Sequence, residues 1–165
     1  MQELKQELRS SIRDKRLLAL VRIRQQIERS GLRTSYFSLA EPLTLDPDST
    51  CRWQATIVIG EFIETQPDKV WRVARELGQS PKPDIRVAAS TVLLEHLLQY
   101  YPARMGALFE EQLRTCNHRL ASAISSCGNF GRTSSAKKRI QRVIKLAKQR
   151  SNTGMQPTAQ RTRRG

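Results

Sequence analysis

The chain has 165 residues, with 29 Lys or Arg against 15 Asp or Glu and a formal net charge of +14. This length suits one globular domain with tails, and 38% hydrophobic residues with only 5% aromatic residues favour helices over a turn-rich β-sandwich. The longest apolar stretches are much shorter than the roughly 18 residues that a membrane span needs, so no transmembrane segment is predicted. The charged N-terminus does not resemble a secretory signal, and we expect a cytoplasmic protein.

The charge is unevenly distributed along the chain. Residues 1–33 carry nine basic and four acidic side chains, residues 34–131 carry nine and eleven, and residues 132–165 carry eleven and none. The middle of the chain is therefore close to neutral. A polyanionic partner such as a nucleic acid is expected to bind at the ends, chiefly at the C-terminal one.

Residues 1–31 are predicted to form one N-terminal amphipathic helix. Residues 2–30 contain neither Pro nor Gly, and Gly31 supplies a stop. The apolar residues that share one helical face are Leu4, Leu8, Ile12, Ala19, Ile23 and Ile27. Residues 32–47, which include Pro42 and Pro47, are predicted to be a connecting loop.

Residues 46–150 are predicted to form the main helical domain. In the apolar segment from Ser49 to Thr65, the β-branched run at residues 56–59 also suits a buried strand, but the length of the segment favours a helix. Further helices are expected from Pro67 to Gly78, after Asp84, from Pro102 to near Cys116, and from Ala136 to Arg150. The helix predicted after Asp84 is the most apolar, and the substitution Val92→Asp in it is expected to unfold the domain.

Two of the predicted helical hairpins share a sequence pattern. RWQATIVIGE (residues 52–61) aligns with RVAASTVLLE (residues 86–95) at an offset of 34, with Arg and Glu at the same ends. A weaker third copy, RLASAISSCG (residues 119–128), follows at an offset of 33. Internal similarity at this period indicates a helical solenoid, in which stacked hairpins share one core.

The turns before these helices carry a family resemblance. Asp46-Pro47-Asp48 leads into Arg52, and Pro83-Asp84-Ile85 leads into Arg86. This pattern resembles the HEAT-type repeat over roughly residues 46–128. The resemblance implies an all-α fold, a short right-handed α-solenoid of about three HEAT-like hairpins with an N-terminal helix and a basic C-terminal helix. Because its relatives are mostly scaffolds and adaptors, the resemblance implies a protein-interaction role and no chemistry.

Arg52, Trp53 and Arg86 are candidate partner-binding residues. The two arginines recur at one repeat position, where they would form a basic ladder that meets an acidic partner or phosphates. Alternatively, each arginine pairs with the Asp of its own or a neighbouring repeat and fixes the stacking. Trp53 would stack on bases, as in the HEAT-like glycosylases that remove alkylated bases, or pack between helices.

The predicted C-terminal helix combines an apolar stripe with positive charge. The stripe consists of Ala136, Ile140, Val143, Ile144 and Ala147. The candidate partner-binding residues on the same helix are Lys138, Arg142, Lys145 and Lys148. One interpretation is a helix that caps the end of the solenoid. The alternatives are a helix that binds nucleic-acid phosphates and, last, one that lies on an anionic membrane surface, for which the stripe lacks an aromatic anchor. Residues 151–165 are predicted to be a disordered basic tail.

No motif predicts catalysis, a metal site or a cofactor. His96 lies beside Glu95, but no nucleophile is adjacent in the sequence. The candidate zinc ligands are Cys51, Cys116, His118 and Cys127. Zinc sites usually supply their ligands as close pairs, and Cys51 and Cys127 have no such neighbour, so the three cysteines are expected to be free thiols. The sequence therefore predicts a non-enzymatic protein-interaction module, with a nucleic-acid-binding protein as the alternative.

Overall fold

A computed structural model describes residues 1–153, and over this range the chain forms helices and turns without a strand. The predicted all-α fold is confirmed, and the β-branched run at residues 56–59 is helical. The elements are α1 (Gln2–Leu8), α2 (Arg13–Ser30), α3 (Thr34–Ala40), η1 (Glu41–Leu45), α4 (Ser49–Gly60), α5 (Pro67–Gly78), α6 (Pro83–Ala88), η2 (Ala89–Leu94), α7 (Glu95–Tyr100), α8 (Pro102–Thr115), α9 (His118–Ser125) and α10 (Ser134–Thr153). None of the helices in this range has the length and apolar character to cross a membrane.

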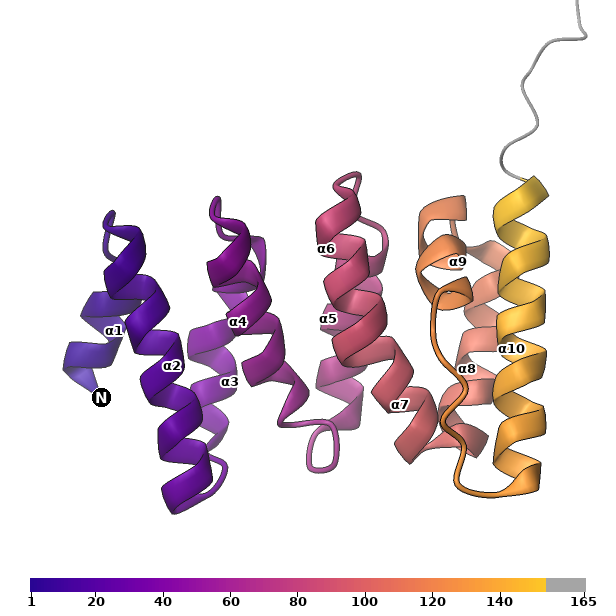
Figure 1. Ribbon diagram of the computed structural model, residues 1–165, viewed down its shortest axis with the longest axis horizontal. Helices are drawn as coiled ribbons and strands as arrows, with labels where there is room; N and C mark the ends of the chain where they lie inside the picture. The colour runs from indigo at the N-terminus through magenta and orange to yellow at the C-terminus, as the bar shows by residue number, and fades with distance from the viewer. Residues whose placement is uncertain (154–165) are drawn as a thin grey trace, which may run out of the picture.

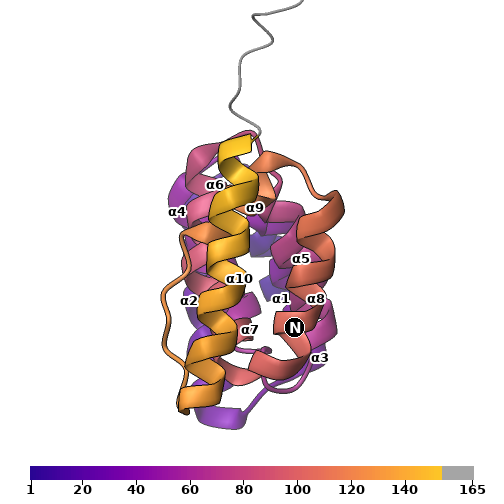
Figure 2. The same cartoon turned by 90° about the vertical axis from the view of Figure 1, so that its right-hand side faces the viewer.

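The helices lie side by side along the long axis of the molecule. Figure 1 shows α2, α4 and the α6–α7 helix in one layer, with α3, α5 and α8 in a second layer behind it. The view along the long axis separates the same two layers (Figure 2). Elements α6, η2 and α7 form one continuous helix, of which η2 is a π-helical segment. Because each hairpin is short, its apolar residues are covered only by stacking on its neighbours.

The hydrophobic core runs between the two layers from α1 to α10. Aromatic side chains link neighbouring elements within it: Phe37 meets Phe62 edge to face, and Trp71 stacks on Phe109 with ring centroids 4.7 Å apart. The predicted repeat alanines, Ala55 and Ala89, are completely buried. One contiguous core over all the hairpins means that none of them is expected to be stable alone.

The prediction of a single helix over residues 2–30 is wrong. The helix is broken at residues 9–12, where the hydroxyl of Ser10 accepts a hydrogen bond from the amide of Ile12 at 3.1 Å. Serine favours such local bonds over the helical pattern. The guanidinium of Arg16 also binds the carbonyls of Ser10 and Ser11 at 2.9 and 3.1 Å, which stabilises the turn.

The prediction that residues 32–47 form a loop is also wrong, since α3 and η1 occupy most of this segment. Its buried residues have helical spacing: Tyr36, Phe37, Ala40 and Leu43. Pro42 lies in the first turn of η1, where its missing N–H is tolerated. Proline at that position opens the helical turn, whereas the sequence interpretation took it as a breaker.

Three arginines make equivalent contacts at one edge of the molecule. Arg16, Arg52 and Arg86 are each the fourth residue of their helix, in α2, α4 and α6. In each case Nη1 donates to two carbonyls of the preceding turn, six and five residues earlier. Two of the arginines also reach the next hairpin: Arg16 binds Asp46 at 2.6 and 2.9 Å, and Arg52 binds Asp84. We call this series of contacts the arginine ladder.

The ladder connects neighbouring hairpins through shielded charges. The side chains of Arg16 and Asp46 are only 11% and 4% exposed, and that of Arg52 is 10% exposed. The hydrogen bond from Arg52 holds the pKa of Asp84 below its ordinary value. Of the two readings of Arg52, the contacts match pairing with the Asp of a neighbouring hairpin. The Asp84 side chain is 49% exposed, so only the Arg16–Asp46 pair is shielded on both sides, and removing one partner of such a buried pair typically costs about 3–5 kcal/mol.

Helix α10 covers the end of the row. It packs against α8 and α9, and Figure 2 shows it running across the end face. The predicted apolar stripe is its buried face. Gly106 of α8 permits close approach, because a Cβ there would lie 2.9 Å from Cδ of Arg139. The helix continues to Thr153, so residues 151–153 are helical and not part of a tail, and the rest of the predicted tail, residues 154–165, lies outside the described range.

Candidate interaction surface

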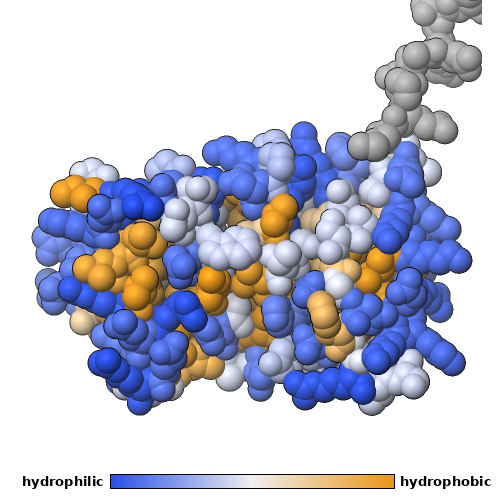
Figure 3. Space-filling model, in the orientation of Figure 1, coloured by the Kyte–Doolittle hydropathy of each residue, from blue (hydrophilic) through white to orange (hydrophobic). Residues whose placement is uncertain are grey.

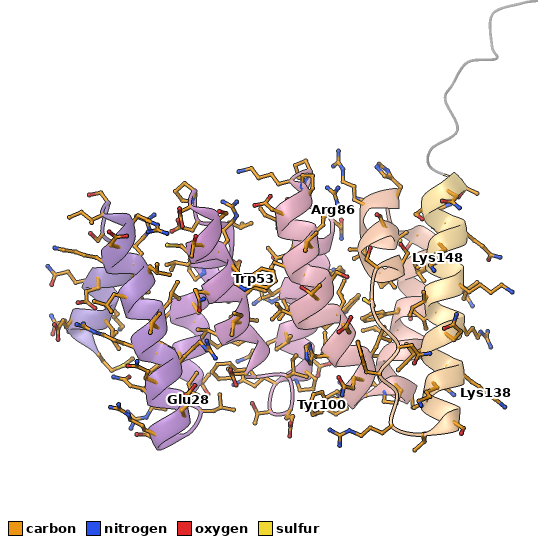
Figure 4. All side chains as sticks on the ribbon, in the orientation of Figure 1. Glu28, Trp53, Arg86, Tyr100, Lys138 and Lys148 are labelled. Carbon is orange, nitrogen blue, oxygen red and sulfur yellow. The ribbon has the colours of Figure 1, made fainter. Side chains whose placement is uncertain are left out.

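Two neighbouring pockets form a groove between α4 and the α6–α7 helix. It contains an upper pocket of about 360 Å³ and a lower pocket of about 420 Å³, and Trp53 lines both of them. In Figure 4, Trp53 lies in the space between the two helices. We call this feature the Trp53 groove.

The two pockets of the Trp53 groove differ in chemistry. The upper pocket is bordered by Val87 and by the Arg52–Asp84 pair of the ladder. The lower pocket is lined by apolar residues together with Glu61, Glu64, His96 and Tyr100. The groove therefore offers apolar surface with polar groups at its margins.

Several large apolar side chains are exposed in and near the groove. Trp53 is 38% exposed, Val87 53% and Tyr100 39%. In the space-filling view, hydrophobic surface lies across the middle of this face, whereas the surface over α10 is hydrophilic (Figure 3). Grouped exposed apolar residues, unlike scattered ones, are typical of binding sites.

Glu95 and His96 make separate interactions. The Glu95 carboxylate accepts a hydrogen bond from the amide of Gly128 at 2.6 Å, which fastens the segment before α10. The His96 ring lies 3.1 Å from the carbonyl of Val92, one turn earlier. The two side chains do not form a hydrogen-bonded acid–base pair, and His96 instead contributes to the wall of the groove.

The structure separates the seven candidate binding residues into different locations. Arg52 is buried, Trp53 lies in the groove, and Arg86 lies at the edge of the molecule and is partly exposed. The remaining four are on α10 and are exposed: Lys138, Arg142, Lys145 and Lys148. Arg142 pairs with Glu110 at 3.1 Å, whereas the three lysines make no ion pair within residues 1–153. Figure 4 shows Lys138 and Lys148 far along the molecule from Trp53.

The three cysteines are free thiols with different exposure. Cys51 and Cys127 are buried, and Cys116 is partly buried. Burial raises the pKa of the Cys51 thiol to about 11 and that of Cys127 to about 12. Within residues 1–153, no three side chains among His, Cys, Asp and Glu are grouped so that they could hold a metal ion.

Sequence reasoning missed some residues of the surface and of the ladder. Val87 and Tyr100 border the groove, but each lies in a helix that the sequence marks only as apolar. Arg16 was missed because its partner, Asp46, is 30 residues away, near the end of a segment expected to be loop. Its place as the fourth residue of a helix, like that of Arg52, is the signal that would have revealed it.

The third sequence copy is out of register with the ladder. The alignment places Arg119 with Arg86, but Arg119 is the second residue of α9. The fourth residue of that helix is Ala121, which is completely buried. The alignment therefore shifts the third repeat by two positions relative to the first two.

Comparisons with protein-family models, curated proteins and solved structures yield no significant match to the chain.

Proposed function

We propose that the chain is a short α-solenoid of HEAT-like hairpins and that it acts as a non-enzymatic protein-interaction module. The solenoid proposal is supported by the arginine ladder, since helices α2, α4 and α6 hold an arginine at the same position with the same turn contacts. We place the protein in the cytoplasm, where its three free thiols would remain reduced.

The observation that carries the interaction role is the exposure of Trp53 between two pockets. Tryptophan is enriched among residues that dominate binding energy, because one side chain buries a large apolar area. Because Trp53 lines both pockets, a partner that fills either of them contacts this side chain. A protein segment that lies along the Trp53 groove would satisfy this arrangement.

A second candidate function is nucleic-acid binding through α10. The helix presents a row of exposed cations, and no acidic residue follows Glu111 in the sequence. Phosphate contacts require only such accessible cations. The groove favours the first candidate, because phosphates would leave its apolar surface uncovered.

Peptides selected from a random phage-displayed library against the protein test the proposed function. We expect Trp53→Gln to lower the affinity of the protein for the selected peptides by about thirtyfold, which is the loss typical of a binding hot spot. The matched control is Leu45→Gln, since Leu45 is 66% exposed but lies outside the groove. Equal affinity for the wild-type protein and the Trp53→Gln variant would show that the groove is not the binding site.

A further inference from the structure

Each arginine of the ladder, with its turn contacts, forms one step. The third step, at Arg86, has no acidic partner. Nη1 of Arg86 binds the carbonyls of Ser80 and Pro81 at 2.8 and 3.0 Å, as the equivalent nitrogens of Arg16 and Arg52 bind theirs. Within residues 1–153, no acidic side chain forms an ion pair with Arg86. Residues 112–165 contain no Asp or Glu, so the chain after α8 cannot supply one.

The next hairpin places a cation where the earlier step has a carboxylate. Asp84, which binds Arg52, is the second residue of α6. Helix α9 packs against α6, and its second residue is Arg119. The neighbouring Asn117 side chain is occupied, because it caps α9 through the amides of Arg119 and Leu120, both at 3.1 Å. The third step thus holds two arginines and no acid.

Asp84, the carboxylate two residues before Arg86, is already paired with Arg52, and the other charges near this step are positive. Lys82, in the turn before α6, is exposed. Arg150 of α10 lies near Cys116, where its charge opposes the rise that burial causes in the pKa of that thiol. No carboxylate of the first turn of α9 or of α10 offsets these cations, because neither element contains one. The potential at this edge is therefore positive and attracts anions.

The third step and the Trp53 groove share helix α6, which packs against α4 at the groove and against α9 at the step. Arg86 is followed by Val87, which lines the upper pocket together with Trp53. Figure 4 places Arg86 near the upper end of the helix that borders the groove. A single extended segment can therefore contact the arginine and the pocket at once.

We propose that the third step of the ladder binds a carboxylate from an acidic protein segment, whose apolar residue enters the pocket beside Val87 and Trp53. The inference rests on the proposed function and adds the chemistry of the partner. The carbonyls of Ser80 and Pro81 already orient the guanidinium, so less conformational entropy is lost on binding. Its free N–H groups bind a carboxylate as Arg16 binds Asp46, through two parallel hydrogen bonds. A nucleic acid would supply anions but no apolar side chain for the pocket.

Binding of a hexaglutamate peptide, blocked at both ends, tests this proposal directly by calorimetry at low ionic strength. We expect Arg86→Gln to weaken binding by at least about tenfold. The control Lys69→Gln removes an exposed cation from α5, away from the ladder, and is expected to weaken binding by less than about threefold. Absence of binding, or equal losses in the two variants, would overturn the proposal.

Hexathymidylate serves as the nucleic-acid probe in the same measurement. We expect it to bind more weakly than hexaglutamate and to be affected similarly by the two substitutions. If hexathymidylate binds as tightly as hexaglutamate and loses affinity only in Arg86→Gln, the step is a phosphate site and the proposal is wrong.

An Arg119→Asp variant tests, without any ligand, whether the third step accepts a carboxylate. The new carboxylate is expected to pair with Arg86, to raise the melting temperature above that of Arg119→Asn, and to abolish hexaglutamate binding. In the Arg86→Gln background, Arg119→Asp should not raise the melting temperature above that of Arg119→Asn. Equal melting temperatures for Arg119→Asp and Arg119→Asn would overturn the proposal. Because these variants leave Trp53 unchanged, failure of the groove as a binding site would appear separately, in the Trp53→Gln comparison.

Discussion

The buried thiols of Cys51 and Cys127 show how packing controls the protonation state of a single side chain. Cys51 lies at the start of α4, with its Sγ 3.8 Å from the carbonyl of Arg13, and Cys127 lies beside Ser90 with 3.7 Å between Sγ and Oγ. These weak partners do not compensate a thiolate for the water that it would lose. The neutral thiol is therefore strongly favoured in the folded protein.

This preference predicts a loss of stability at alkaline pH. The ordinary thiol pKa is 9.0, and the pKa of Cys127 is raised to about 12. Above pH 9 the thiol ionises in the unfolded chain only, so the free energy of unfolding falls by up to about 1.4 kcal/mol per pH unit for each such thiol. Urea unfolding at pH 8 and pH 10 should therefore show a smaller pH-dependent loss for Cys127→Ala than for the wild-type protein. The same loss in both would contradict the assigned burial.

At the scale of the element, the π-helical segment η2 determines which side chains of the α6–α7 helix reach the core. Leu93 and Leu94 are completely buried, whereas Val92 is partly buried and lines the lower pocket. The expectation that Val92 lies in the core is therefore corrected. Val92 also contacts α4, since a Cβ on Gly60 would lie 3.2 Å from its Cγ1.

Substitutions at neighbouring positions of η2 should have opposite outcomes. Leu93→Asp places an unpaired charge in the core, which costs several kcal/mol and should abolish cooperative unfolding. Val92→Asp places the carboxylate at the groove, within reach of water, and should leave a folded protein with a lowered melting temperature. Circular dichroism melts of the two variants check this order. An unfolded Val92→Asp variant would show that this position belongs to the core.

The elements that the sequence predicted well are those with clear helix boundaries. Pro67 and Gly78 delimit α5, and Pro102 opens α8, as expected from residues that start and stop helices. The break in the first predicted helix was not foreseen, because it depends on side-chain hydrogen bonds of Ser10 and Arg16 that the apolar periodicity does not show. Similarly, the Trp53 groove depends on the spacing of α4 and α6, which no local pattern encodes.

Across the whole molecule, ion pairs and unpaired cations are separated along the long axis. The ladder pairs bind the hairpins of α2, α4 and α6, while the last acidic residue of the chain is Glu111 in α8. Helix α10 buries its apolar stripe and exposes its cations at the end of the row. In our account this helix covers the core, and partner binding takes place at the Trp53 groove and the third ladder step.

The central claim is that α10 covers the core and does not bind a partner. Its most direct test is the salt dependence of binding to a duplex oligonucleotide. The test variant carries Lys138→Glu, Lys145→Glu and Lys148→Glu on α10, and the charge-matched control carries Lys5→Glu, Lys15→Glu and Lys69→Glu, all at exposed positions. We expect weak binding by the wild-type protein and similar reductions in the two variants, with melting temperatures little changed. A steep dependence of log affinity on log salt in the wild-type protein, lost by about one slope unit per phosphate contact in the α10 variant alone, would contradict the account and identify α10 as a nucleic-acid-binding surface.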